Sequence, residues 1–407
     1  MFKIKISIDA LVNSHYNLMC HCAYISNFNI KRNLTEQKEE TAFWSVEVKE
    51  LIYLPIEKLT EGMELARNIP GINPMLPFAV SGCKLSERMI CRMKTIGVQG
   101  AYICTAITQG IEPEDFVEPE LKTKMLTSIR DVFDQSLKKF TFQSSRQVYE
   151  EIAKVAESVV MNVLNKDKYL FQMIDIRDYD GYTYSHSLYV GILSVLLGKY
   201  IGLSISNLND LALCGLLHDI GKTDIPIDIT NKPGPLTKDE FEIMKQHPSL
   251  SYKKLGDHIV ISQTVLQGVQ THHEKFDGTG YPFGLSGKDI PLYARILAIA
   301  DVYDALNSTR PYRKAWSPRR IFDYLTSCSN THFDPELLTA FLHCVSAYPI
   351  GTIVHLSDGS SAVVKDNTPG FSLRPIIRFI SPPQKAGRDV DLSCELFNLT
   401  IIDDDEC

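Results

Sequence analysis

The segment HHEKFDGTGYP at residues 272–282 decides the fold of this chain, because two adjacent imidazoles and a carboxylate precede a glycine-rich turn. A second unusual cluster, HDIGK, lies upstream at residues 218–222. Imidazole nitrogens beside carboxylate oxygens suit divalent first-row metals such as iron, manganese or zinc. A chain that gathers such ligands at several points in helical surroundings is expected to form a multi-metal hydrolytic centre.

The sequence around these clusters predicts a succession of amphipathic helices from about residue 182 to 348, with no strong strand pattern between them. Capping residues and glycines set their expected ends. The expected helices cover about 184–201 before Gly202, a stretch from a Ser206 cap to near Gly221, a stretch from a Thr237 capping box through His247, then 262–274, 292–308, and a last helix that Asp334 and Pro335 begin.

The regions before and after these helices have β-rich sequence patterns instead, which predicts a multidomain chain. Short β-rich runs at 50–55, 77–80 and 100–104 surround a helical stretch at 86–96, which indicates a small α+β domain. After residue 349, β-branched runs with an Asp358-Gly359 turn indicate a β-rich domain. We expect a leader of uncertain order at 1–46, a small α+β N-terminal domain at 47–110, a helical connector at 111–149, an all-α catalytic domain at 150–349, and a small β-rich C-terminal domain with an acidic tail at 350–407.

Composition limits the partners and the compartment. The net charge of −7 over 407 residues argues against a nucleic-acid polymer or an anionic membrane surface as partner. The ten scattered cysteines are typical of reduced thiols in the cytosol. The longest apolar stretch, 189–203, contains Lys199 and is shorter than the roughly 20 residues of a membrane-spanning helix. We expect a soluble, cytoplasmic protein without membrane insertion.

The candidate metal ligands each lie in or at the end of an expected helix. A single histidine is more often a hydrogen-bonded core or surface residue than a ligand. Asp301 is a stronger candidate, because it interrupts the apolar run RILAIADVYDAL, where a buried carboxylate is costly unless it is paired or metal-bound. Neighbouring positions such as 218 and 219 point about 100° apart on a helix, so the two side chains could serve different metals, or the aspartate could bridge two. The candidates are His186, His218, Asp219, His247, His272, His273 and Asp301.

An ordered series of motifs over about residues 150–350 resembles the HD-GYP family, bacterial phosphodiesterases of the HD superfamily that cleave cyclic di-GMP. The motifs are YTYSHS at 182–187, LLHDIGK at 216–222, KPGPLT at 232–237, HHEKFDGTGYP at 272–282, ADVYDAL at 300–306 and RPYR at 310–313. The resemblance implies an HD-type helical catalytic domain. It also implies hydrolysis of cyclic di-GMP to linear pGpG, with further hydrolysis to GMP left open.

The resemblance implies a two-metal site with iron or manganese as the expected ions. A hydroxide between the two ions would be the nucleophile. Asp219 and Lys222 would be catalytic, and Lys222, Tyr281, Arg310 and Arg313 would contact the substrate. Tyr281 could equally be a structural turn residue, and the arginines a solvated helix end. One metal would be held by His186, His218, Asp219 and Asp301, and the second by Asp219, His247, His272 and His273.

The chain departs from the family pattern at three positions. Tyr182 stands where some members carry a glutamate that holds a third metal, so we expect two metals. Ser251 and Asn330 each replace a customary glycine; the serine could alter helix packing slightly, and asparagine tolerates the left-handed backbone.

Two other functions stay open at this point. One is hydrolysis of another cyclic dinucleotide or of a nucleotide. The other is a non-catalytic module that senses the dinucleotide or acts as a scaffold. Expected partners are cyclic di-GMP, a second copy in a homodimer, and a diguanylate cyclase of the GGDEF type.

Overall fold

The computed structural model describes residues 51–69, 77–96, 98, 100–104, 111, 115–136, 142–166, 171–172, 182–258, 261–308, 315–395 and 398–402. The expected leader, the acidic tail, and Arg310 and Arg313 lie outside these residues. The backbone of Tyr182 is described, but its side chain is not.

A small α+β unit stands at the N-terminal side. Strands β1 (Leu51–Pro55) and β2 (Gly100–Cys104) pair antiparallel. Helix α1 (Glu87–Thr95) begins where the Ser86 hydroxyl accepts a hydrogen bond from the Met89 N–H. A short 3₁₀ turn, η3 (Ile56–Lys58), follows β1. The expected strand at 77–80 is reduced to one isolated bridge between Ile69 and Ala79.

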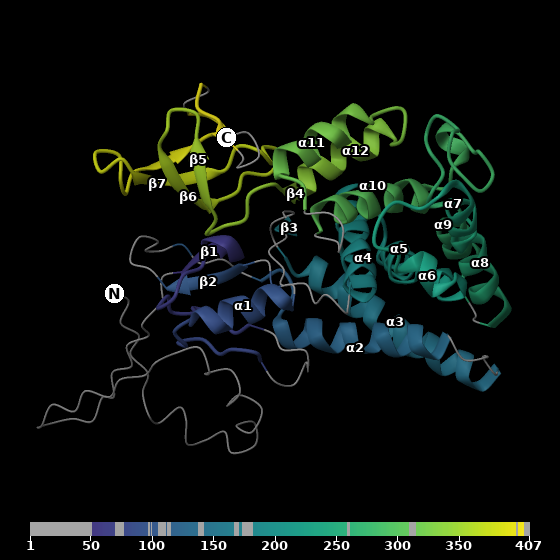
Figure 1. The fold of residues 1–407 in the computed structure, drawn as a ribbon. Helices are drawn as coiled ribbons and strands as arrows, with labels where there is room; N and C mark the ends of the chain where they lie inside the picture. Colours follow the sequence, from purple (N-terminus) through teal and green to yellow (C-terminus); the bar gives the residue numbers. More distant parts are fainter. Residues whose placement is uncertain are drawn as a thin grey trace, which may run out of the picture.

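The middle of the chain is helical and packs around α4 (Figure 1). Helix α4 is buried on nearly all sides, which is typical of a central core helix. It contacts α2, α3, α5, α10 and α12. The helices are α2 (Pro119–Ser136), α3 (Phe142–Leu164), α4 (Tyr182–Tyr200), α5 (Ile205–Leu217), α6 (Ile227–Thr230), α7 (Lys238–Met244), α8 (His247–His258), α9 (Gln263–Thr271), α10 (Leu292–Asn307), α11 (Pro318–Ser327) and α12 (Pro335–Cys344), with 3₁₀ turns η6 (Ile220–Asp224) and η7 (Gly287–Asp289).

Several expected helix boundaries were wrong. Ser204, not Ser206, caps α5, because its hydroxyl accepts the Asn207 N–H. The same helix ends at Leu217 instead of near Gly221, and a 3₁₀ turn follows. His247 begins α8 instead of ending the preceding helix, because the backbone leaves the α7 helix at Lys245. The errors at the end of α5 and at the start of α8 fall at His218 and His247, where the chain turns sharply.

The C-terminal part is a five-stranded antiparallel sheet in the order β8-β7-β6-β5-β9. The predicted hairpin is present, with Gly359 at a φ of 80° in its turn. Strand β8 was not expected from the sequence. The strands are β5 (Ile353–Leu356), β6 (Ser361–Asp366), β7 (Ile376–Ser381), β8 (Asp389–Asp391) and β9 (Ile401–Ile402), and a separate parallel pair joins β3 (Phe171–Gln172) to β4 (Val345–Ser346).

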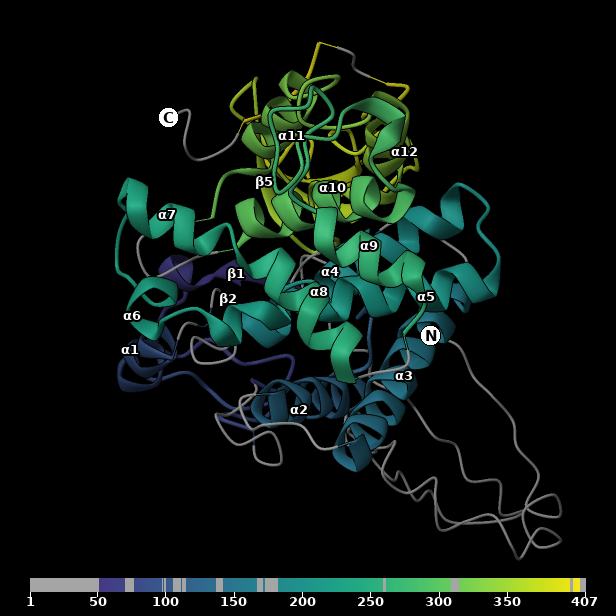
Figure 2. The ribbon, with the colours of Figure 1, turned by 90° about the vertical axis from the view of Figure 1, so that its right-hand side faces the viewer.

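Figure 1 shows the C-terminal sheet and the N-terminal α+β unit on the same side of the helical part, and Figure 2 shows the molecule from the opposite side, with α7, α8 and α9 toward the viewer. The Tyr53 N–H of β1 donates to the Gly351 carbonyl just before β5, at 2.9 Å. Among the described residues, no helix combines the length and apolar character needed to cross a membrane.

Candidate metal centre

The structure brings all seven candidate ligands to one place among α4, α5, α8, α9 and α10. We call this set the histidine–aspartate cluster. Two of its members lie inside helices, and the other five lie at or next to helix ends, where the chain can aim a side chain inward. His186 lies in α4, His218 caps α5 and Asp219 follows it, His247 opens α8, His272 caps α9 and His273 follows it, and Asp301 lies in α10.

Asp219 lies between the two halves of the cluster. Its Oδ2 is 3.3 Å from the Nε2 of His218 and 3.7 Å from the Nε2 of His186. Its Oδ1 is 3.3 Å from the Nε2 of His247. A carboxylate whose two oxygens face different imidazoles has the geometry of a bridging ligand.

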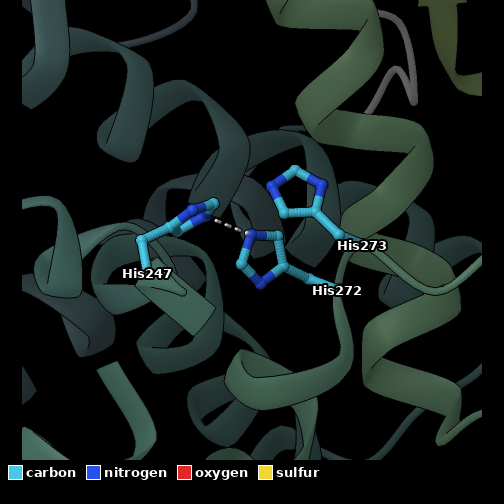
Figure 3. Close-up of side chains that lie close together, drawn as sticks. All are labelled: His247, His272 and His273. Atoms are coloured by element: carbon cyan, nitrogen blue, oxygen red, sulfur yellow. Dashed lines mark hydrogen bonds between the residues drawn. The ribbon is translucent and has the colours of Figure 1, made fainter. Parts of the chain in front are cut away.

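The ligand atoms form three overlapping groups, each within 4.8 Å. In one of them, the Nε2 atoms of His247 and His272 lie 3.4 Å apart, with the ring of His273 beside them (Figure 3). Imidazole nitrogens this close repel unless a cation or a proton lies between them. The groups are His186, His218 and Asp301; His247, His272 and His273; and His218, Asp219 and His272.

Backbone carbonyls fix the orientation of three of the imidazoles. Each ring places its Nδ1 against the carbonyl three residues earlier, and because a carbonyl only accepts, the Nδ1 must donate. In a neutral ring of this orientation the Nε2 atom carries no proton and faces the cluster as a possible metal ligand, as in many metal sites. The pairs are His218 with Gly215 at 2.8 Å, His247 with Met244 at 2.7 Å, and His272 with Val269 at 2.6 Å.

A buried acid that sequence reasoning missed orients the fourth imidazole. The Oδ2 of Asp304 lies 2.7 Å from the Nδ1 of His186, while the Nε2 of His186 faces Asp301 at 3.1 Å. Asp304 is completely buried in α10. The available signal was a second acid three residues after Asp301 in the same apolar helix, which puts both on one helix face.

The cluster contains buried polar atoms that lack hydrogen-bond partners. They are the Nε2 of His218 and the Oδ1 of Asp219, whose approach to His247 does not have hydrogen-bond geometry. Leaving such atoms buried and unpaired is costly. Both are ligand types for a divalent cation, so the residues present fit a metal group.

Apart from that of His186, the shifted protonation states in the cluster favour metal ligation. Burial opposes a charge on His186, but hydrogen bonds to Asp301 and Asp304 raise its pKa to about 9. Burial lowers the pKa of His272, and it lowers that of His273 to about 3. Burial also opposes charge on Asp219 and Asp301, but the nearby histidines, and Lys222 for Asp219, hold both carboxyl pKa values well below the usual range. Neutral His272 and His273 beside the ionised Asp219 and Asp301 are in the states that bind metals, whereas His186 must give up a proton to become a ligand.

Two of the expected substrate contacts are described, and both lie at the cluster. The Nζ of Lys222 is 2.5 Å from the Oδ2 of Asp219. The ring of Tyr281 lies 4.9 Å from that of His273. Burial, with the charges of Asp301 and Asp219, raises the pKa of Tyr281, so its phenol stays neutral.

Two acids in the HHEKFDGTGYP segment shape the loop. The buried Glu274 accepts the backbone N–H groups of Phe283 at 2.7 Å and Leu285 at 3.1 Å. Asp277 accepts the N–H and hydroxyl of Thr279. Glu274 therefore ties the segment's end back to its start, and Asp277 forms a local turn.

Ser251 links α8 to the HDIGK turn. Its hydroxyl accepts the Gly221 N–H at 2.8 Å and donates to the His218 carbonyl at 3.0 Å. Gly221 has no room for a side chain, because a Cβ there would lie 2.2 Å from the carbonyl oxygen of His247. The serine in place of glycine at 251 therefore adds two hydrogen bonds beside two of the candidate ligands. At the third departure, Asn330 adopts a φ of 62°, a left-handed conformation that asparagine tolerates.

Comparison with known proteins identifies the helical region. Residues 170–337 match the family model of the HD domain. The resemblance to HD-GYP proteins is confirmed, because several curated relatives carry the name of the corresponding activity.

Three relatives illustrate the match. A cyclic di-GMP phosphodiesterase of Pseudomonas aeruginosa is 38% identical over 224 residues, which are 55% of this chain and 54% of the relative. Another, from Thermotoga maritima, is 35% identical over 54% of this chain and 59% of its own. A 3′3′-cGAMP-specific phosphodiesterase of Vibrio cholerae is 37% identical over 39% of this chain and 31% of its own. The chain thus spans little more than half the length of the first two.

Proposed function

We propose that this protein is a metal-dependent phosphodiesterase that hydrolyses cyclic di-GMP to linear pGpG. The observation that supports this most strongly is the histidine–aspartate cluster, where two buried ligand atoms lack partners. The relatives named as cyclic di-GMP phosphodiesterases support the substrate. The alternative of a non-catalytic sensor or scaffold has no comparable structural support.

The proposal includes two divalent cations, with iron or manganese the expected ions. Asp219 would bridge them, because its two oxygens face different imidazoles. A bound pair of cations supplies Lewis acidity and lowers the pKa of water so that hydroxide is available at neutral pH. His186, His218 and Asp301 would complete one site, and His247, His272 and His273 the other.

The chain's own cations and dipoles would hold the substrate. The Nζ of Lys222 lies beside Asp219 and is half-exposed, so it can turn toward a phosphate oxygen and offset its charge. The neutral phenol of Tyr281 can donate a hydrogen bond at the edge of the cluster. We also keep Arg310 and Arg313 as proposed phosphate contacts, since guanidinium groups bind phosphate with two parallel hydrogen bonds.

A second candidate substrate is another cyclic dinucleotide. The relative that is specific for 3′3′-cGAMP gives a particular reason to test it. Cyclic di-GMP and 3′3′-cGAMP share the ring of two phosphodiesters and differ in one base. Competition between the two substrates in one reaction measures the preference directly.

Chromatographic analysis of products from purified protein tests the activity. We expect pGpG from cyclic di-GMP, loss of turnover on chelation, and its return with manganese or ferrous iron. Asp219→Ala should abolish turnover, because it removes the proposed bridge. Cleavage that persists in the Asp219→Ala variant, or no cleavage under any metal supply, would reject the proposal; retained binding of a diguanylate cyclase without turnover would favour the scaffold.

We propose a small N-terminal α+β domain, a helical connector, the catalytic domain and a β-rich C-terminal domain at the boundaries given above. A homodimer, a diguanylate cyclase partner and a cytoplasmic location stay predictions from the sequence.

A further inference from the structure

A row of aromatic rings leads outward from the histidine–aspartate cluster. The ring centroids of His272 and His273 are 4.1 Å apart, and those of His273 and Tyr281 are 4.9 Å apart. Tyr281 in turn meets Phe241 of α7, with centroids 6.5 Å apart and planes at 82°. The two outer rings form a corner that begins at the proposed reaction centre.

Phe241 is exposed in a way that core packing does not explain. Its relative exposure is 45%, although burying a phenylalanine ring normally stabilises a protein. Helix α7 contains no buried residue at all. An exposed ring beside a buried polar centre is suited to cover a ligand that has a flat face.

The position of Phe241 is fixed by its helix. Thr237 and Glu240 form a complete capping box at the start of α7. The Nζ of Lys232 adds an ion pair to Glu240 at 2.5 Å. The short helix is thus held at its start, and the ring is presented by an ordered backbone.

A cation lies beside both rings. The Nζ of Lys245 is 5.0 Å from the Phe241 centroid and 5.9 Å from the Tyr281 centroid. Its ion pair with Glu242, at 2.6 Å, keeps it on this side of α7. A guanine presents two acceptors, O6 and N7, on one edge, whereas adenine presents a donor and an acceptor there.

We propose that Phe241 and Tyr281 form the aromatic corner on which one purine base of a cyclic dinucleotide stacks, with Lys245 directed at the acceptor edge of a guanine. This inference rests on the proposed function and extends it to base recognition. A base is joined through its sugar to the phosphate being cleaved, so a base subsite must adjoin the metal centre. Aromatic side chains that stack on bases contribute about 1–3 kcal/mol each.

Steady-state kinetics of three phenylalanine variants test the stacking. Phe241→Leu keeps an apolar side chain but removes the ring, and Phe241→Trp restores a ring. Phe371→Leu is the matched control, because Phe371 has a similar exposure of 49% in the C-terminal part. For cyclic di-GMP, we expect Phe241→Leu to raise KM about 5- to 150-fold with kcat within about twofold, the fold-change that about 1–3 kcal/mol of stacking gives. Phe241→Trp should lie near wild type, and the control should match wild type.

The outcomes separate this inference from the proposed function. Wild-type turnover with an unchanged KM in Phe241→Leu would overturn the stacking alone, and so would a Phe241→Trp variant as impaired as the leucine variant. A wild type that neither binds nor cleaves any cyclic dinucleotide would overturn both. Lys245→Met should raise KM more for cyclic di-GMP than for cyclic di-AMP; equal effects would remove the lysine from base recognition.

Discussion

The Nδ1 of His186 on α4 lies 2.7 Å from the Oδ2 of Asp304 on α10, and both side chains are buried. The contact joins two helices that are more than 100 residues apart in the chain, and it leaves the Nε2 of His186 toward Asp301. Partners of this kind orient metal ligands and make them more basic.

The substitution Asp304→Asn should therefore weaken metal binding at the cluster without unfolding the protein. The amide oxygen can still accept the hydrogen bond, but the negative charge that favours His186 as a ligand is lost. We expect a decrease of about 10- to 100-fold in metal affinity or turnover. Titration of the chelated protein with manganese, followed by turnover, measures both. Asp323→Asn on the exposed face of α11 is the control, and an Asp304→Asn variant with wild-type metal affinity would contradict the role.

Ser251→Ala should lower the free energy of unfolding by about 1–3 kcal/mol, because it leaves the Gly221 N–H buried without a partner. Denaturant unfolding measures the loss. Ser158→Ala is the matched control, since its hydroxyl bonds only to the Lys154 carbonyl on an exposed helix face, and its effect should stay within about 0.5 kcal/mol. Equal stability of the two variants would show that Ser251 does not support the HDIGK turn.

Asp334 joins α12 to α10, and its substitutions should form a graded series. Its carboxylate accepts the Glu336 and Leu337 N–H groups and pairs with Arg295 at 2.6 Å. Asp334→Asn keeps an N-cap oxygen but loses the ion pair, whereas Asp334→Ala loses both. Removing one partner of a buried ion pair costs about 3–5 kcal/mol of the free energy of unfolding. We expect the alanine variant to lose an amount near the upper end of this range, and the asparagine variant to be less stable than wild type but more stable than the alanine variant. Chemical denaturation measures the order, and a reversed order would contradict it.

Asp389 should make the C-terminal sheet sensitive to acid. A hydrogen bond from Arg378, with one from Lys365, lowers its pKa to about 2. A lowered carboxyl pKa contributes stability above the unfolded pKa, near 4, and this contribution is lost as pH falls through about 2. Hydrogen exchange of residues 376–391 in wild type should thus be slower than in Asp389→Asn at pH 7 and should converge with it near pH 2. A constant difference at all pH values would reject the titration of Asp389 as its cause.

The sequence predicted most of the helical part because capping residues and apolar periodicity are local signals. Thr237 and Asp334 each cap the helix expected of them. The predicted helix boundaries were wrong at His218, which caps the end of α5, and at His247, which begins α8. The side chains of the cluster converge at these helix ends. Gly221 allows close contact with α8 there, which no local pattern reports.

The candidate site was predictable as a set of residue types and only partly as a geometry. The motifs identified the seven ligand candidates, and the structure gathers them. Asp304 was missed because an acid in an apolar helix does not reveal its partner on another helix. Phe241 was missed because a phenylalanine in an amphipathic helix is expected to be buried. Strand β8, with only three residues, was too short to give a pattern.

The metal content of purified, active protein tests the central claim most directly. Elemental analysis and cyclic di-GMP turnover on the same sample should give two iron or manganese ions per chain. Asp219→Ala should lose turnover together with metal. Full turnover in a sample without bound metal, or three ions per active chain, would contradict the two-metal account.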